Sequence, residues 1–211
     1  MTRHEGPAVV VAGAGGMARE ALAWLEDVEP RTRVLGFVAG PDTPAGTTLL
    51  DMPVWADLET PASDSGALRV LLAVGSPTIR RRVARQAQEL GLGLAYVVHP
   101  SAHLGPGVKV GPGVIVGPHV VLTRDIEVGT GAIVNFSAAV GHDSRIGDFA
   151  FVGPGANLGG EVTLAPDAYL GLGCCLLPGT AVGAGATVAA GAVVTRDVAA
   201  GSTVIGVPAR P

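Results

Sequence analysis

The sequence predicts two parts: a small α/β domain with a parallel sheet over residues 1–97, and a parallel β-helix of six-residue repeats over residues 98–211. Two observations predict the β-helix. From Val98 onward every sixth residue is a branched aliphatic, and the next residue is usually glycine. The α/β domain rests on a third: a short apolar run near the N-terminus precedes a glycine turn and an amphipathic segment.

The repeat keeps one phase throughout. A six-residue period fits neither a helix nor a simple alternating strand, and it is typical of a solenoid of short strands and tight turns. A small or β-branched residue follows four positions after each aliphatic, so both positions face inward and stack on their copies. A disordered or collagen-like glycine tract would not keep this phase. The aliphatic positions are Val98, Leu104, Val110, Val116, Leu122, Val128, Val134, Val140, Ile146, Val152, Leu158, Leu164, Leu170, Leu176, Val182, Val188 and Val194.

In the N-terminal part, residues 8–12 predict a buried strand, and the glycine turn over 13–16 leads into a helix over 17–28. Ser76 is a good N-cap for a helix that ends near Gly91. The four arginines of that helix predict a solvated face. Further strands are predicted over 34–38, 70–74 and 94–98, and the four arginines are Arg80, Arg81, Arg82 and Arg85.

The glycine turn has two interpretations. A strand, a glycine turn and a helix place backbone N–H groups and a helix N-terminus towards an anion such as a phosphate. A plain tight turn between a strand and a helix has the same composition. The domain is too short for a full dinucleotide-binding fold.

Composition narrows the class of protein. The chain of 211 residues has a formal net charge of −4 and no basic patch, so we expect no nucleic-acid partner. No apolar run is long enough to span a bilayer, and the N-terminus lacks the apolar core of a signal peptide. The adjacent Cys174 and Cys175 predict neither a disulfide nor a zinc site. These features predict a cytoplasmic protein with reduced cysteines and no membrane partner.

Several stretches carry a family resemblance. The chain resembles the hexapeptide-repeat acyltransferases, and among them the bacterial sugar acetyltransferases related to the sialic acid O-acetyltransferase and to nucleotide-linked 4-amino-sugar N-acetyltransferases. The resemblance implies a left-handed β-helix and a homotrimer. It also implies a nucleotide-linked sugar in the N-terminal domain and acetyl-CoA between neighbouring prisms. The matching stretches are VVVAGAGGMARE, VLGFVAG, LLAVGSPTIRRRV, VVHPSAHLG, AVGHDSRIGDFAFVGPGANLGG, YLGLGCCLLPG and VIGVPAR.

His142 is the candidate general base among five histidines. A neutral imidazole suits proton abstraction near pH 7, and the adjacent Asp143 can accept a hydrogen bond from its N–H. With a coil of 18 residues, Asp125 and Glu161 occupy the equivalent positions one coil below and above Asp143. Stacked acids would raise the basicity of the imidazole. The other histidines are His4 near the terminus, His99 where the coils begin, and His103 and His119 in the coils.

The resemblance implies the remaining site residues. Gly13, Gly15, Gly16, Asp42 and Gly75 would bind the nucleotide-linked sugar, with the first three holding the diphosphate. Gly159, Leu172, Ala190 and Arg210 would contact acetyl-CoA. The repeat would itself supply glycines at such turns, and a solvated terminal arginine is the alternative at Arg210.

The sequence departs from its relatives at two places. Relatives often carry a second histidine nine residues after the catalytic one, and Phe151 occupies that position here. Relatives also often end the second strand with two acids that contact the nucleotide or sugar. Here only Asp42 follows that strand, and it is displaced.

We expect an acetyl-CoA-dependent N-acetyltransferase acting on a nucleotide-linked amino sugar, with His142 as general base and no metal. Alternatives are an O-acetyltransferase of a sialic-acid-like sugar and a non-catalytic trimeric scaffold that binds a nucleotide-linked sugar. A carbonic-anhydrase-like β-helix would need stacked metal-binding histidines. His119 and His142 are 23 residues apart, which does not match an 18-residue coil.

Overall fold

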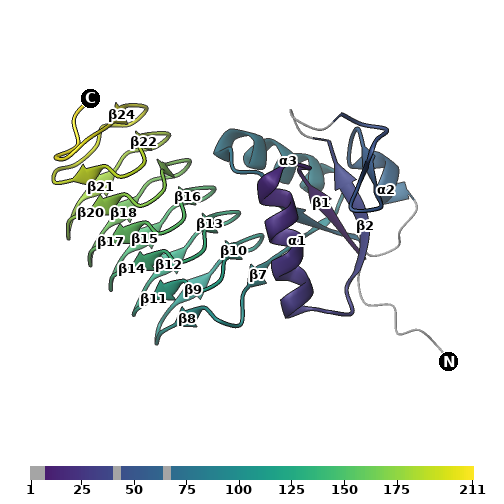
Figure 1. Ribbon diagram of the computed structural model, residues 1–211, viewed down its shortest axis with the longest axis horizontal. Helices are drawn as coiled ribbons and strands as arrows, with labels where there is room; N and C mark the ends of the chain where they lie inside the picture. The colour runs from purple at the N-terminus through teal and green to yellow at the C-terminus, as the bar shows by residue number, and fades with distance from the viewer. Residues whose placement is uncertain (1–7, 40–43, 64–67) are drawn as a thin grey trace.

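The computed structural model describes residues 8–39, 44–63 and 68–211. Figure 1 shows the two predicted parts side by side, the α/β domain and a column of stacked coils. The α/β sheet has the order β3-β4-β2-β1-β5-β6. Its elements are β1 (Ala8–Ala12), α1 (Gly16–Val28), β2 (Arg33–Val38), β3 (Thr48–Leu49), β4 (Met52–Trp55), α2 (Glu59–Ser63), β5 (Leu68–Leu72), α3 (Pro77–Glu89) and β6 (Gly93–Ala95).

The structure confirms the predicted strands and helices of this domain, except that the strand predicted over 94–98 is two: β6 lies in this sheet, and Val97–Val98 belongs to the prism. All sheet pairs are parallel except β3 with β4, and β5 begins two residues earlier than predicted. The helix α1 buries Ala18, Ala21, Leu22 and Leu25 against one face of the sheet, and α3 covers the other face. The short β3, β4 and α2 were not predicted, because two to five residues carry too little periodicity.

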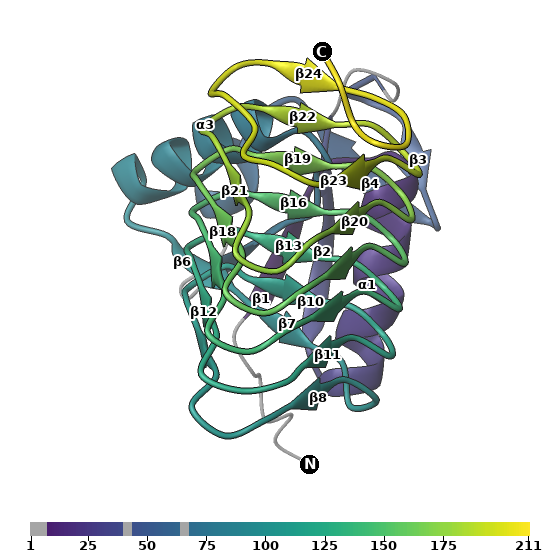
Figure 2. The ribbon, with the colours of Figure 1, turned by 90° about the vertical axis from the view of Figure 1, so that its left-hand side faces the viewer.

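The repeats form a triangular prism of stacked coils, which Figure 2 shows obliquely from the end that carries the C-terminus. Strand residues pair with the residue 18 positions on, as Ile115 does with Ile133, except in the last coil, where Val188 pairs with Val204, 16 positions on. The first prism sheet contains β7 (Val97–Val98), β10 (Ile115–Val116), β13 (Ile133–Val134), β16 (Phe151–Val152), β19 (Tyr169–Leu170), β22 (Thr187–Val188) and β24 (Thr203–Val204). The second contains β8 (His103–Leu104), β11 (Val121–Leu122), β14 (Ala139–Val140), β17 (Asn157–Leu158), β20 (Cys175–Leu176) and β23 (Val193–Val194). The third contains β9 (Lys109–Val110), β12 (Glu127–Val128), β15 (Arg145–Ile146), β18 (Thr163–Leu164) and β21 (Ala181–Val182).

Close approach of neighbouring coils explains the glycine that usually follows the aliphatic. A Cβ at Gly141 would lie 2.5 Å from the backbone of Gly159 and Gly160, and one at Gly153 would lie 2.6 Å from Leu170 O. Two residues further on, the turn takes a left-handed conformation, as at Asp143 with φ of 57°. Asparagine, aspartate and glycine tolerate that conformation best.

The C-terminal segment covers one end of the prism. Ile205 and Arg210 exchange two backbone hydrogen bonds of 2.8 and 2.9 Å, and Ala209 N donates to Val193 O at 2.8 Å. Ala209 also packs against the prism core. The backbone of the final coils therefore has partners at the C-terminal end.

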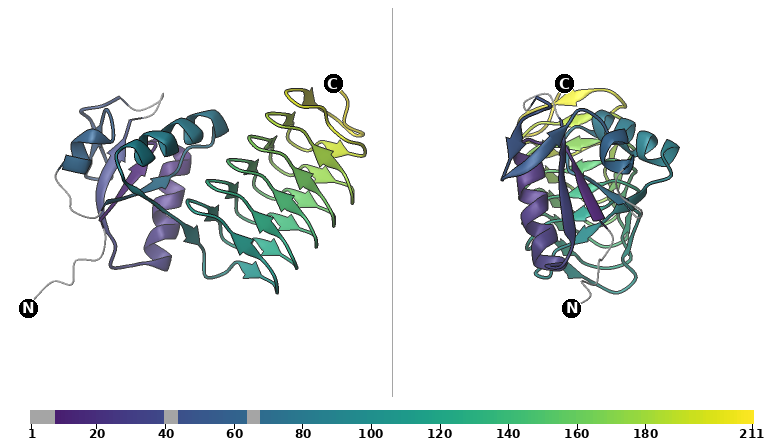
Figure 3. Two further views of the ribbon diagram at one scale, coloured as in Figure 1. Left: turned by 180° about the vertical axis from the view of Figure 1, so that it is seen from behind. Right: turned by 90° about the vertical axis from the view of Figure 1, so that its right-hand side faces the viewer.

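The α/β domain packs on the outer face of the first prism sheet (Figure 3). Ile115, Ile133 and Phe151 on that face join one apolar cluster with Trp24 and Leu25 of α1. The strand β7 already belongs to the prism, and the predicted boundary between residues 97 and 98 falls within it.

The helix α3 corrects one sequence-based prediction, because Arg80 is fully buried. Its Nη1 donates to Val74 O and Gly75 O at 2.7 and 2.8 Å, and its Nε donates to Gly131 O at 3.0 Å. Its Nη2 donates to the carbonyls of Phe149 and Ala150. Burial lowers the pKa of Arg80 to about 9, so the side chain stays charged at neutral pH. The prediction of a solvated arginine face was wrong at this residue, which joins the α/β domain to the prism.

Candidate active site

His142 lies on the edge between the second and third prism sheets, in the turn from β14 to β15. Its Nδ1 is 2.8 Å from Oδ2 of Asp143, and the side chains of both residues are about 60% exposed. When Nδ1 carries the proton, it donates to the carboxylate and leaves Nε2 free to accept a proton. The pair therefore has the geometry of an oriented general base.

Neighbouring coils hold the backbone of this turn. Glu161 N donates to His142 O at 2.7 Å, and Asp143 N donates to Arg124 O at 3.1 Å. The hydroxyl of the buried Ser144 accepts from Val162 N at 3.1 Å. These bonds fix the backbone position from which the imidazole side chain extends.

The predicted stack of acids is present, because Asp125, Asp143 and Glu161 take the same left-handed turn position in three successive coils. Asp125 forms a bond of 3.1 Å with its neighbour Arg124. The carboxylate that contacts His142 is that of Asp143. Because Asp125 already has a cationic partner, Asp143 is the acid that orients the imidazole.

Gly160 lies directly beside the imidazole, although its place in the repeat does not distinguish it from other turn glycines. A Cβ at this position would lie 2.6 Å from His142 Nε2 and 2.7 Å from Cε1. We expect Gly160→Ala to turn the ring away from its position and lower kcat by about tenfold, since a displacement near 1 Å has large effects on oriented catalysis. Steady-state kinetics checks this, with Gly93→Ala as control because a Cβ there meets only Arg69 at 3.7 Å. Unchanged kcat in Gly160→Ala would contradict it.

The glycines predicted to bind the nucleotide-linked sugar lie together in the α/β domain. Gly13, Gly15, Gly16 and Gly75 line one pocket of about 250 Å³ at the carboxyl ends of β1 and β5. The sheet order changes direction between these two strands, which is where ligands bind in open α/β sheets. Gly13 has φ of 106°, and a Cβ there would lie 2.8 Å from Ala73 O. Asp42 lies outside the described residues.

The residues predicted to contact acetyl-CoA lie in three places. Leu172 and the residue one coil above it, Ala190, stack on the edge between the first and second prism sheets, where Leu172 is 57% exposed. Gly159 lies beside His142 on the other edge of the second sheet. Arg210 lies in the C-terminal segment, with its Nη1 donating to Ala209 O at 2.8 Å.

Within one chain the glycine pocket and His142 lie on different sides of the prism. The turn before α1 is near the first–second edge, because Asn135 Nδ2 on that edge lies 3.8 Å from Met17 Sδ. His142 occupies the second–third edge. The glycine pocket and His142 are therefore separated by the second prism sheet.

Phe151 does not lie near His142 of its own chain. Its ring is buried and stacks on Tyr169, with centroids 4.8 Å apart and planes at 8°. The substitution of an aromatic ring for the histidine of relatives thus adds to the apolar contact between α/β domain and prism.

The other histidines have separate environments. His99 contacts Asp27 at 3.2 Å and Ser101 at 2.8 Å, which holds the start of the coils against α1. His103 and His119 are exposed on the prism. His4 lies outside the described residues.

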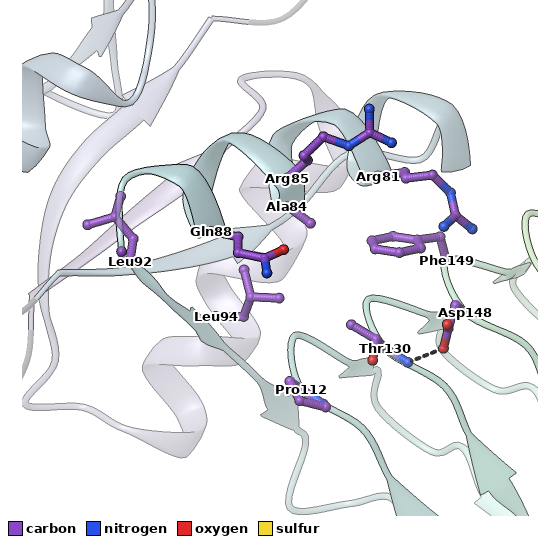
Figure 4. A pocket seen from close by; sticks show the side chains of 11 residues that line it. Arg81, Ala84, Arg85, Gln88, Leu92, Leu94, Pro112, Thr130, Asp148 and Phe149 are labelled. Atoms are coloured by element: carbon purple, nitrogen blue, oxygen red, sulfur yellow. Dashed lines mark hydrogen bonds between the residues drawn. The ribbon is translucent and has the colours of Figure 1, made fainter.

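A hollow of about 650 Å³ lies between α3 and the third–first edge of the prism (Figure 4). Arg81 stands over the ring of Phe149 at 4.4 Å and forms a bidentate pair with Asp167. The wall facing α3 includes Thr130 and Asp148. None of the predicted site residues lines this hollow, so it is separate from the candidate active site.

Neither a metal centre nor a membrane span is found in what the structure describes. Residues 8–39, 44–63 and 68–211 contain no group of three or more His, Cys, Asp and Glu side chains arranged to hold a metal ion. None of the helices in these ranges has the length and apolarity that crossing a bilayer requires.

Comparison with known proteins agrees with this architecture. The family model for bacterial transferase hexapeptide (six repeats) matches residues 96–124. Perosamine N-acetyltransferase from Caulobacter crescentus, solved with CoA and GDP-perosamine, is 34% identical with a TM-score of 0.86, covering 97% of this chain and 96% of that chain. WeeI from Acinetobacter baumannii AYE is 29% identical with a TM-score of 0.90, covering 97% and 99%. No curated protein matches the chain.

The acetyltransferase domain of PglB from Neisseria gonorrhoeae FA1090, solved with acetyl coenzyme A, is 28% identical with a TM-score of 0.69, covering 98% of this chain and 100% of that chain. All three likenesses extend over both the α/β domain and the prism. The chain belongs to the left-handed β-helix family of sugar acetyltransferases, and it is an acyltransferase.

Proposed function

We propose that this enzyme transfers the acetyl group of acetyl-CoA to the amino group of a nucleotide-linked amino sugar. The observation that carries the proposal is the His142–Asp143 pair, an oriented base on an exposed edge of the prism. The Caulobacter relative supports it, since that enzyme is named for N-acetylation of perosamine. It holds CoA and GDP-perosamine in variants with one histidine replaced by asparagine or alanine.

The reaction needs a base and an oxyanion donor. The amine attacks the thioester carbonyl carbon, and Nε2 of His142 takes the proton that the nitrogen loses. The negative oxygen of the tetrahedral intermediate accepts a hydrogen bond from a backbone N–H beside the imidazole, for which Gly160 is the candidate. The intermediate then expels the CoA thiolate, which His142 reprotonates, leaving an amide and free thiol.

The glycine pocket and the exposed prism edge supply groups that could bind the two substrates. Gly13, Gly15 and Gly16 offer the N-terminus of α1 to the diphosphate, and Gly75 closes the same pocket. The exposed Leu172 suits the pantetheine arm. We propose Asp42 as a further substrate contact, and Ala190, Gly159 and Arg210 as further acetyl-CoA contacts.

The surface of the second prism sheet supports a homotrimer. Its outward-facing residues include no Asp, Glu, Lys or Arg, whereas the third sheet presents charged side chains such as Lys109, Glu127 and Arg145. Three copies with their second sheets turned to a common axis bring His142 of one chain towards Leu172 of the next. The outward residues of the second sheet are His103, Val121, Ala139, Asn157, Cys175 and Val193.

We expect Val121→Lys to break this assembly. Three added cations would meet near the axis, since Val121 lies on the second sheet and is 37% exposed. Analytical ultracentrifugation should show trimer for the unmodified protein and monomer for Val121→Lys, with acetyl transfer lost. Thr163→Lys on the third sheet is the matched control and should remain trimeric and active. A monomeric but fully active Val121→Lys protein would contradict the shared site.

The reaction itself is tested with purified protein, acetyl-CoA and a panel of nucleotide-linked amino and hydroxy sugars. Release of free thiol reports turnover. Turnover with amino sugars alone supports N-acetylation, and turnover with hydroxy sugars alone supports O-acetylation of a sialic-acid-like sugar. Binding without turnover for every sugar supports the scaffold.

We propose that the enzyme works in the cytoplasm. Cys174 and Cys175 are free thiols, as in a reducing compartment. Burial raises the pKa of the Cys174 thiol to about 12, so this thiol is unreactive at neutral pH.

A further inference from the structure

Ser144 is a polar residue in the apolar core of the prism, directly after the His142–Asp143 pair. Its side chain is fully buried. The equivalent positions one coil below and one coil above are Ile126 and Val162, which pack in the same core. A buried hydroxyl is costly unless it is hydrogen-bonded, so the partners of this one indicate its role.

The hydroxyl joins both ends of the turn formed by residues 159–162. Its Oγ accepts from Val162 N at 3.1 Å and lies 3.4 Å from Gly159 O, to which it can donate. The turn one coil above has no hydroxyl beneath it and closes directly, from Thr180 N to Leu177 O at 3.3 Å. The turn over 159–162 is thus closed through a side chain from the coil below it.

The same hydroxyl reaches the turn that carries the base. Its Oγ lies 3.4 Å from His142 O. A hydroxyl has a single proton, so it donates to His142 O or to Gly159 O while it accepts from Val162 N. Ser144 therefore links the backbone of its own turn to the backbone of the turn one coil above.

The upper turn contains Gly160, the proposed oxyanion donor. A Cβ at this glycine would lie 2.6 Å from His142 Nε2, so the glycine backbone is close to the reacting nitrogen. In the part of the chain that the structure describes, Gly160 N–H donates no hydrogen bond, which leaves it for a substrate oxygen. The relative position of base and donor depends on how the turn over 159–162 closes.

We propose that Ser144 is a positioning residue for acetyl transfer. Its hydroxyl sets the turn that presents Gly160 N–H, and so fixes the distance between that donor and Nε2 of His142. Preorganised donors lower the barrier because they need no rearrangement when the negative oxygen forms. This inference rests on the proposed function and adds to it the group that couples the base to the oxyanion donor.

Ser144→Ala tests this role by steady-state thiol release. Alanine occupies the same repeat position in other coils, as at Ala156, so the variant should fold, with a thermal midpoint changed by no more than about 4 °C. Without the hydroxyl, Val162 N has Gly159 O as its acceptor, and the turn should tighten. We expect kcat to fall by about tenfold, since the oxyanion donor is displaced and not removed. The KM for acetyl-CoA should stay within about twofold, as for an interaction made in the transition state.

Two further variants separate positioning from packing. Thr180→Ala removes a buried hydroxyl at the same repeat position two coils above, where it donates to Leu177 O at 2.7 Å, and it should leave kcat unchanged. Ser144→Thr keeps a hydroxyl in a side chain that Thr180 shows to fit this position, and it should retain most of the activity. Equal kcat for Ser144→Ala and the unmodified enzyme would overturn the proposal, as would an equal loss in Thr180→Ala.

A crystal structure of Ser144→Ala keeps this test separate from that of the reaction. The turn over 159–162 should close directly between Gly159 O and Val162 N, with Gly160 N–H displaced. An unmoved Gly160 in that structure would overturn the positioning role even if the unmodified enzyme acetylates amino sugars. A complete lack of acetyl transfer by the unmodified protein would refute the proposed reaction, and the variant structure would still decide whether the hydroxyl sets the turn.

Discussion

We expect His142→Ala to lower kcat for acetyl transfer by about 10²- to 10⁴-fold, the usual contribution of a positioned general base. The imidazole is exposed and its removal leaves the turn bonds of Glu161 and Asp143 to the backbone intact, so the fold should persist. Arg145→Ala, an exposed side chain three residues further on, is the matched control. Steady-state thiol release measures both variants.

Binding measurements complete this test. Acetyl-CoA should still bind to His142→Ala by calorimetry, because the side chain acts on a proton and not as an anchor. Asp143→Asn should lose less activity, and asparagine tolerates the left-handed backbone at this position. Full activity of His142→Ala would contradict the proposal that His142 is the general base.

The largest effect on stability should come from Arg80→Met. Methionine fills much of the space but leaves the carbonyls of Val74, Gly75, Gly131 and Phe149 without the donors that Arg80 gives them, while Ala150 O keeps its bond from Ile133 N. Each unsatisfied buried group costs about 1–3 kcal/mol, so we expect the free energy of unfolding to fall by about 3 kcal/mol or more.

Urea denaturation followed by circular dichroism measures that loss. The exposed Arg85→Met on the same helix is the control and should change the free energy of unfolding by less than about 0.5 kcal/mol. Arg80→Lys should fall between the two, because an ammonium has three donors in place of five. Equal stability of Arg80→Met and Arg85→Met would show that the buried guanidinium does not join the two parts of the chain.

The prism could be predicted because its core is periodic. Val140 and Ile146 take the same place in successive hexads, so one rule covers every coil. The glycine turn and the His142–Asp143 contact were also accessible, since they involve adjacent residues. Contacts between residues that are adjacent in the sequence can be predicted from the sequence alone.

Contacts between distant segments could not be predicted. Arg80 meets carbonyls about 50 and 70 positions further along the chain, and nothing in its own helix indicates them. Gly160 resembles every other turn glycine until the structure places it beside an imidazole.

The segment that folds over the last coil has a consequence for how copies of this protein meet. A solenoid of parallel strands has two open ladders, and each could accept the ladder of another molecule and grow into a fibre. Here the C-terminal segment turns back on itself through Ile205 and Arg210, and Ala209 N donates to Val193 O at the free edge of the second prism sheet. This segment therefore obstructs head-to-tail growth through that sheet at one terminus of the column, and association side by side does not use that edge.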